Sequence, residues 1–277
     1  MEGRRWEDLA YDCLVVVFSK LGLDDLAAGV PLVCKSWHGA AMDPQCWTTL
    51  DFEKLDFTSM SAFAARFKCE FHVKGFSFSS FFKLAVARSH GSASKIAIPS
   101  VPGNVLKKFD ELNRRCPRIK ELVLPTLLRR EDKEIPAMIK KWKELEILQM
   151  KWKPTSFMEM LEQIRIHCPN FRGLQLCGFF ERQDAAAMAR CLPKLKRLKM
   201  RASVLRKEEM VMILEGCGEL EIFDVTNCRG FVADNDIRNR GSRIKKFDYN
   251  GCKVESFYAN GYCINYDDLV FALFCGD

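Results

Sequence analysis

The stretch Leu195-Lys196-Arg197-Leu198-Lys199-Met200 decides the fold of this chain, because its pattern of apolar residues recurs along the sequence. Written as apolar-x-x-apolar-x-apolar, the pattern returns about every 25 residues, a period typical of repeat proteins. Its clear copies begin at Ile119, Leu145, Phe171, Leu195, Leu220 and Ile244. We therefore expect an array of stacked units with a long open face instead of a closed pocket. Such a shape favours the binding of another macromolecule over catalysis.

Weaker copies of the pattern extend the array toward the N-terminus and begin at Trp47, Val73 and Ala93. Together the copies predict about seven to nine units over residues 47–264, and the pattern resembles that of leucine-rich repeats. Each unit pairs a short strand with a helix, and proline or glycine follows the helices, as at Pro193. The predicted fold class is α/β, with parallel strands on the concave face and helices on the convex face. Residues 265–277 predict a short capping helix over the last unit.

The composition bounds the class of protein. The chain has 277 residues, 48% of them hydrophobic, which is enough for a sizeable core. Its net charge of +7 permits an acidic partner without requiring nucleic acid. No apolar run approaches the length of a membrane span, and the first residues lack the apolar core of a signal peptide. We therefore expect an intracellular protein of the nucleus, the cytoplasm or both, with no nucleic-acid partner and no membrane partner.

The thirteen cysteines predict buried packing residues and no metal site. Their number is odd, no C-x-x-C pair is present, and several recur at fixed places in the repeat, such as Cys168 and Cys228. Nucleotide-binding loops, nucleophile elbows and paired catalytic side chains are also absent from the sequence. We therefore predict a protein that is not an enzyme and that needs no cofactor.

The first residues break the repeat pattern and predict three short helices. One extends from Asp8 to Leu21, a second begins at Leu23 and is capped by Asp24, and Pro31 opens a third. So short a group of helices buries little apolar surface by itself. A partner is expected to cover its apolar side.

This N-terminal segment resembles an F-box. The matching residues are Trp6-Glu7-Asp8-Leu9, Leu14, Val17-Phe18, Leu21, Leu26, Val33-Cys34-Lys35-Ser36-Trp37 and Pro44-Gln45-Cys46-Trp47. Followed by leucine-rich repeats, the segment makes the whole chain similar to the F-box/leucine-rich-repeat family, and most similar to its plant members. The F-box would occupy residues 1–46. One position departs from the family pattern, because Ala10 follows Leu9 where F-boxes usually have proline.

The resemblance implies a substrate-recognition subunit of an SCF-type E3 ubiquitin ligase. The F-box would dock on a Skp1-like adaptor, and through it on a cullin–RING ligase, while the repeats would bind an unknown protein substrate. Matching positions assign adaptor contacts to Leu9, Leu14, Phe18, Leu21, Leu26, Val33, Cys34 and Trp37. Leu14 and Leu21 fit the core of the module equally well, and Trp37 is expected to be at least partly buried. The alternatives are a repeat scaffold or ligand sensor outside a ligase, and a small-molecule receptor.

Strand alternation predicts which side chains line the open face. The candidate substrate-binding residues are Gln149, Lys151, Trp152, Gln175, Arg197, Lys199, Arg201, Asp224 and Asp248. The middle of this set is basic and its end is acidic, so we expect an acidic segment of a substrate to meet the basic middle. The same residues also fit the solvated polar positions that any exposed strand carries. Trp152, if exposed, would be a stronger anchor than any single charge.

Overall fold

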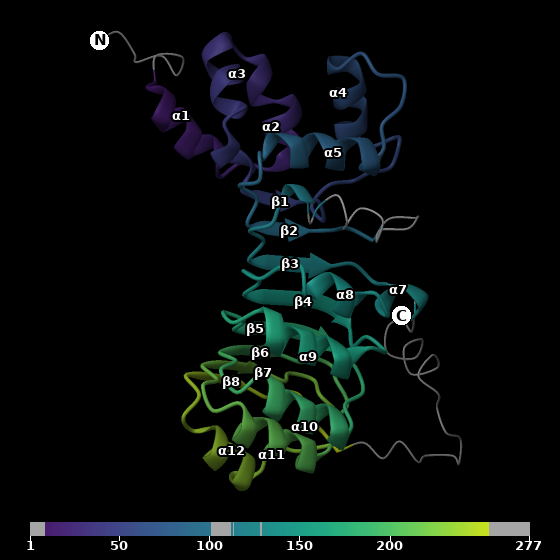
Figure 1. Ribbon diagram of the computed structural model, residues 1–277, viewed down its shortest axis with the longest axis vertical. Coiled ribbons are helices and arrows are strands. Elements are labelled where there is room, and N and C mark those ends of the chain that lie inside the picture. Colours follow the sequence, from purple (N-terminus) through teal and green to yellow (C-terminus); the bar gives the residue numbers. More distant parts are fainter. Residues whose placement is uncertain (1–8, 101–111, 113, 128, 255–277) are drawn as a thin grey trace.

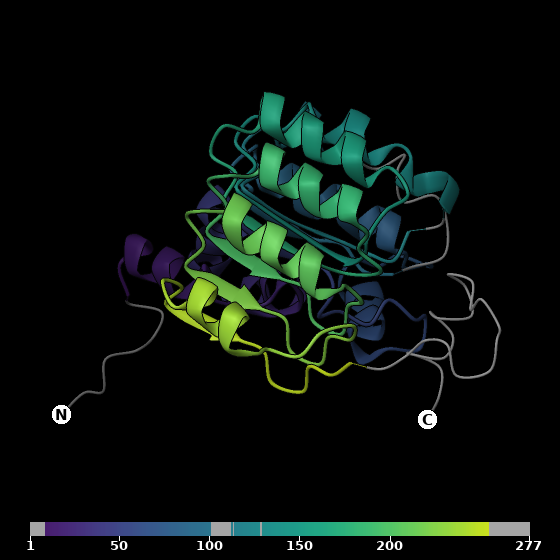
Figure 2. The ribbon, with the colours of Figure 1, turned by 90° about the horizontal axis from the view of Figure 1, so that it is seen from below.

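The computed structural model describes residues 9–100, 112, 114–127 and 129–254 (Figure 1). Within these residues, eight parallel strands follow one another in chain order, and a layer of helices covers one face of the sheet (Figures 1 and 2). The predicted α/β fold class is therefore confirmed. The predicted capping helix at residues 265–277 lies outside the described residues.

Corresponding positions of the repeats form the strands. They are β1 (Thr49–Asp51), β2 (Lys95–Ala97), β3 (Glu121–Leu124), β4 (Ile147–Trp152), β5 (Gly173–Cys177), β6 (Arg197–Lys199), β7 (Ile222–Asp224) and β8 (Lys246–Asp248). The strands pair in register, so the central apolar residue of each lies beside that of the next, as Leu148 does beside Leu174 and Leu174 beside Leu198. These leucines are buried. The repeated pattern thus places one continuous apolar row under the helices.

The helices behind the sheet come from the segments between strands. They are α7 (Arg129–Asp132), α8 (Ile135–Ile139), α9 (Phe157–His167), α10 (Arg182–Cys191), α11 (Lys207–Gly216) and α12 (Asn235–Gly241). Lys153, just after β4, donates to Asp184 at the start of α10 over 2.6 Å, and Asp184 also accepts from the backbone N–H of Glu181. This contact fixes the helix of one repeat to the strand of the repeat before it.

Buried and half-buried cysteines form hydrogen bonds between successive repeats. The Cys168 thiol donates to the carbonyl oxygen of Trp142, the Cys228 thiol to that of Met200 and the Cys252 thiol to that of Val225. The eleven cysteines in the described part of the chain are all free thiols. Cysteines at the repeated positions therefore pack as small apolar residues that also satisfy a buried carbonyl group.

The repeat-like copy at Val73 is not a strand, and the prediction is wrong there. The segment between β1 and β2 instead contains α4 (Ala62–Glu70) and α5 (Phe78–Arg88), and Val73 is exposed in the turn between them. The Ser77 hydroxyl caps α5 by accepting from the Ser80 N–H, so Phe78 begins a helix. The apolar spacing of this segment matches the repeat pattern by coincidence, because its phenylalanines pack in a separate aromatic cluster.

That cluster joins the N-terminal helices to the repeats. The N-terminal segments are α1 (Tyr11–Phe18), α2 (Leu23–Ala28), η2 (Val30–Leu32), α3 (Lys35–Ala41) and η3 (Pro44–Trp47). The rings of Phe52, Phe57, Phe63, Phe67, Phe71, Phe76, Phe78, Phe81 and Phe82 form one network of edge-to-face and stacked contacts. Trp47 is fully buried beside it, where its indole N–H donates to Ala41 and the Arg88 guanidinium lies 5.0 Å from its ring. N-terminal helices and repeats share one core, so the domain boundary at residue 46 stays a prediction.

Close packing between α10 and α11 generates a stability prediction. A Cβ at Gly216 would overlap Cβ and Cα of Ala189, whereas a Cβ at Gly218 would meet no atom within 4 Å. We expect Gly216→Ala to lower the free energy of unfolding by about 1–3 kcal/mol through overpacking. Gly218→Ala, the matched control, should change it by less than about 0.5 kcal/mol. Urea denaturation of both variants measures the difference, and equal stabilities would contradict this packing.

The buried thiols generate a pH prediction. Burial raises the pKa of Cys168 and of Cys217 to about 12, above the ordinary value of 9.0. In the unfolded chain these thiols ionise near pH 9, while in the folded chain they stay protonated. Their stabilisation is therefore complete below that pH and is lost as the pH rises toward the folded values. We expect the free energy of unfolding to fall by roughly 1 kcal/mol per thiol between about pH 8 and about pH 10.

Chemical denaturation under reducing conditions at the two pH values measures this fall. A Cys168→Ala variant removes the titration of this thiol but keeps the lysines and tyrosines, which also titrate at alkaline pH. Its free energy of unfolding should fall less steeply than that of the wild type, and an identical fall in both proteins would contradict the prediction.

Candidate functional site

The face of the sheet opposite the helices carries side chains in regular rows. Because the strands pair in register, one row crosses the sheet through residues from every strand. Its members are Asp51, Ala97, Val123, Gln149, Gln175, Lys199, Asp224 and Asp248. Arg197 belongs to the parallel row that contains Glu121 and Gly173. The prediction that these side chains share one face is confirmed.

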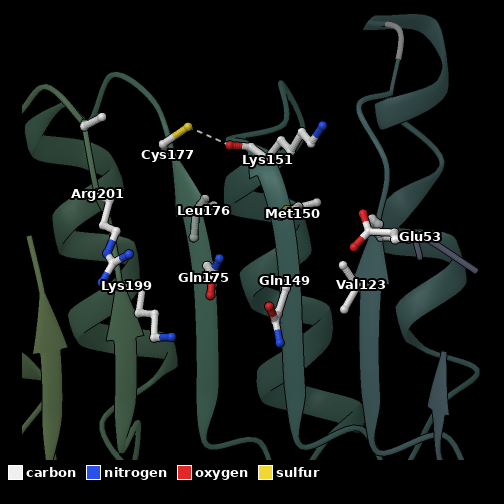
Figure 3. A pocket seen from close by; sticks show the side chains of 12 residues that line it. Glu53, Val123, Gln149, Met150, Lys151, Gln175, Leu176, Cys177, Lys199 and Arg201 are labelled. Atoms are coloured by element: carbon white, nitrogen blue, oxygen red, sulfur yellow. Dashed lines mark hydrogen bonds between the residues drawn. The ribbon is translucent and has the colours of Figure 1, made fainter. Parts of the chain in front are cut away.

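A hollow of about 370 Å³ lies on this open face over β3–β6 (Figure 3). Five of the predicted substrate-binding residues line it, namely Gln149, Lys151, Gln175, Lys199 and Arg201. Val123 and Cys177 are also part of the lining and follow from the same strand alternation. Glu53 lines the opposite margin from β6, which the repeat pattern does not predict because Glu53 lies beyond the end of β1.

Asp224 is not available to a partner, and the prediction is corrected for this residue. It is 6% exposed, its carboxylate accepts from the N–H and hydroxyl of Thr226, and it pairs with Nε of Arg201 at 2.5 Å. Burial raises the pKa of Asp224, but the hydrogen bonds from Thr226 and Arg201 outweigh burial and hold the pKa below its ordinary value. Asp224 therefore ends its strand and positions Arg201.

The remaining basic residues of the face lack such partners. Within the described ranges, no carboxylate pairs with Lys151, Arg197 or Lys199. Lys199 is half-buried beside Gln175, whereas Lys151 is exposed at the end of β4. These lysines place positive charge on the middle of the face, where Lys151 interacts electrostatically with Glu53.

Trp152 and Asp248 lie outside the hollow, as do Arg197 and Asp224. Trp152 is half-buried and pairs with Cys177 across an irregularity in the register of β4 and β5. Asp248 accepts from the backbone and side-chain N–H groups of Asn250 at 3.2 and 2.9 Å. A role for either in binding a substrate stays a prediction.

The Cys177 thiol in the hollow is not activated as a nucleophile. Its thiol donates to the carbonyl oxygen of Lys151 at 2.6 Å, and burial raises its pKa to about 11. The thiol is therefore protonated at neutral pH, and a protonated thiol is a poor nucleophile. Among the described residues, no group of three His, Cys, Asp or Glu side chains is placed to hold a metal ion. In the same residues, every helix is too short or too polar to cross a membrane.

The N-terminal helices contain a second candidate surface, but several predicted contact residues are not part of it. Leu14, Phe18 and Leu26 are at most 2% exposed, which assigns them to the module's own core and corrects their predicted role as direct contacts. The Phe18 ring packs edge-to-face on Trp37 at 5.2 Å, and Trp37 is half-buried as expected. The packing of Phe18 on Trp37 still shapes the surface, because it holds α1 against α3.

Leu9, Leu21 and Cys34 are half-buried, so partner contact by these residues stays a prediction.

The apolar side chains that remain accessible lie on α1 and around η2. Val16 is 64% exposed, Val17 43%, Leu32 46% and Val33 61%. Val33 was predicted as a contact residue. The others were missed because the matching positions emphasise the buried stripe of α1, although Val16 and Val17 lie on the opposite face of the same helix.

Ala10 adopts the backbone conformation of the proline that it replaces. It precedes α1 with φ −57° and ψ 143°, and proline fixes φ near −65°. The hydroxyl of the next residue, Tyr11, donates to Asp43 at 3.0 Å and thereby ties the start of α1 to the segment that begins η3. The backbone at this departure from the F-box pattern is therefore compatible with proline.

Comparisons with known proteins match the same two regions of the sequence. Residues 6–53 match an F-box-like family model, and residues 107–257 match a model of the leucine-rich repeats of FBD-associated F-box protein At5g56370. The chain is 30% identical to F-box/LRR-repeat protein At3g48880 of Arabidopsis thaliana, over 88% of this chain and 83% of that protein. It is 26% identical to F-box protein FBW2 of the same plant, over 92% and 82% of the two chains. For F-box protein SKIP1, also of this plant, the identity is 24%, over 88% and 85%.

Proposed function

Because the chain belongs to the F-box/leucine-rich-repeat family, we propose that it is the substrate-recognition subunit of an SCF-type ubiquitin ligase. Proteins of this family are generally non-catalytic adaptor subunits. The observation that carries the proposal is an N-terminal module with exposed apolar side chains, joined through one core to an open face that carries basic side chains. One end binds the ligase, and the other holds a protein for modification by a different subunit.

The adaptor-binding surface consists of the accessible apolar residues of α1 and η2. Val16, Val17, Leu32 and Val33 are each at least 43% exposed on a module of short helices. Contact with an apolar groove or helix of a Skp1-like adaptor removes these side chains from water. Leu14 and Phe18 support the surface from beneath and keep α1 in place.

The substrate-binding surface is the open face of the sheet. The shared phenylalanine core fixes this face relative to the N-terminal helices, so a substrate bound there lies at a set distance from the adaptor-binding surface. Ligation then depends on effective concentration, because a tethered substrate meets the conjugating enzyme of the ligase far more often than a free one.

An intracellular location is part of the proposal. It is supported by the free thiols of the described part of the chain, since such thiols persist in a reducing compartment.

The exposed valines of α1 test the adaptor surface. A Val16→Asp/Val17→Asp variant places two charges in the proposed contact without touching the core. We expect its affinity for a Skp1-type adaptor to fall at least tenfold, because buried unpaired charges are costly at an interface. Val232→Asp, at a position 53% exposed in the repeats, is the matched control and should bind like the wild type. Isothermal titration calorimetry measures both, and unchanged binding by the double variant would refute this surface.

Ala10 tests whether the unusual residue limits binding. Because the φ of Ala10 already suits proline, Ala10→Pro should raise the free energy of unfolding by about 0.4–1 kcal/mol. The gain arises because proline reduces the conformational entropy of the unfolded chain. Adaptor affinity should stay equal or increase, since the start of α1 does not move. Denaturation and calorimetry on the same variant measure both effects. A loss of stability or of adaptor binding would show that this position requires a conformation other than the one described.

A further inference from the structure

The hollow on the open face has a distinct arrangement of polar groups. Its floor is formed by neighbouring strands, where Gln149, Gln175 and Lys199 lie side by side on β4, β5 and β6 (Figure 3). Arg201 lies at the β6 margin, and Glu53 lies at the opposite margin (Figure 3). The hollow is therefore polarised, with donors and positive charge on one side and a carboxylate on the other.

The donors on the positive side are free to bind a ligand. No carboxylate in the described part of the chain pairs with Lys199, and no described residue hydrogen-bonds the side-chain amide of Gln175. Arg201 uses Nε for Asp224, which leaves its two Nη groups for another acceptor. Because Asp224 is itself held by Thr226, the guanidinium is positioned before any ligand arrives.

The charges around the hollow restrict what it accepts. Glu53 borders it on one side, and Asp248 lies beyond Lys199 in the same row on the other, past the buried Asp224. A long polyanion such as a nucleic acid would extend beyond Lys199 and Arg201 and meet these carboxylates. A single anionic group fits between them, because the positive charge covers only the width of about two strands, roughly 10 Å.

On the basis of the function proposed above, we infer that this hollow binds one anionic side chain of an extended substrate segment, with Lys199, Arg201 and Gln175 as its ligands. Both a carboxylate and a phosphate have the required chemistry, since each accepts charge-assisted hydrogen bonds from ammonium and guanidinium groups. Glu53 then faces neighbouring residues of the same segment and disfavours a second acidic residue there. Lys151, exposed at the end of β4, attracts the segment from a distance.

Short peptide libraries test the inference on the full chain. Three libraries carry a fixed central phosphoserine, aspartate or serine, with the other positions randomised. We expect the immobilised wild type to retain the phosphoserine library, the aspartate library or both at least tenfold better than the serine library. The relative retention of the two anionic libraries identifies the source of the charge. Equal retention of all three libraries would overturn the inference.

Substitutions in the hollow identify the site. Lys199→Glu and the milder Lys199→Gln should each remove the preference for the anionic libraries, whereas Lys194→Glu should keep it. Lys194 is the matched control, because it is exposed just before β6 and no described carboxylate pairs with it. A preference that survives both Lys199 substitutions would refute this site. In a competition experiment, a DNA oligonucleotide is added to the retained peptides. If it displaces them equally from the wild type and from the Lys199 variants, the chain binds polyanions in general and the inference is overturned.

A parallel titration with a Skp1-type adaptor separates this inference from the proposed function. Variants that bind the adaptor normally but have lost the peptide preference support the hollow as the recognition site. A wild type that binds the adaptor but shows no anionic preference overturns only the hollow. A wild type that fails to bind any adaptor overturns the ligase proposal itself.

Discussion

In-register pairing of very short parallel strands is the constraint on which the rest of the structure depends. Each of the eight described strands contains only three to six residues, so no strand buries enough surface to be stable alone. Each repeat contributes one apolar residue to a continuous row, and Leu122, Leu148, Leu174 and Leu198 illustrate it in successive strands. The same register places corresponding polar residues beside one another on the opposite face. Core packing and the open binding face therefore have a single origin.

The phenylalanine network gives the stack of repeats a fixed relation to the N-terminal helices. With Trp47 buried and Arg88 against its ring, the joint has no flexible linker within the described residues. This rigidity suits the proposed subunit, because it would set the distance between an adaptor and a substrate.

Sequence periodicity predicts what repeats and misses what occurs once. The strands, the shared face of Gln149, Gln175 and Lys199, and the packing role of the cysteines all follow from periodic positions. The strand predicted at Val73 is wrong because the phenylalanines that follow it pack in the phenylalanine network and not in the sheet. Glu53 lies outside the pattern, and the pairing of Arg201 with Asp224 depends on side-chain directions that spacing alone does not specify. For the N-terminal module, matching residues identify the fold but do not separate the buried stripe of α1 from its exposed face.

Hydrogen–deuterium exchange on the full chain tests the central claim, that two separate surfaces on one rigid body serve two partners. A Skp1-type adaptor should slow exchange in α1 and around η2 and leave β3–β6 unchanged. A bound anionic peptide should slow exchange in the strands that border the hollow and leave α1 unchanged. Adaptor-induced protection spread over the open face, or no protection of α1 at saturating adaptor, would contradict the account.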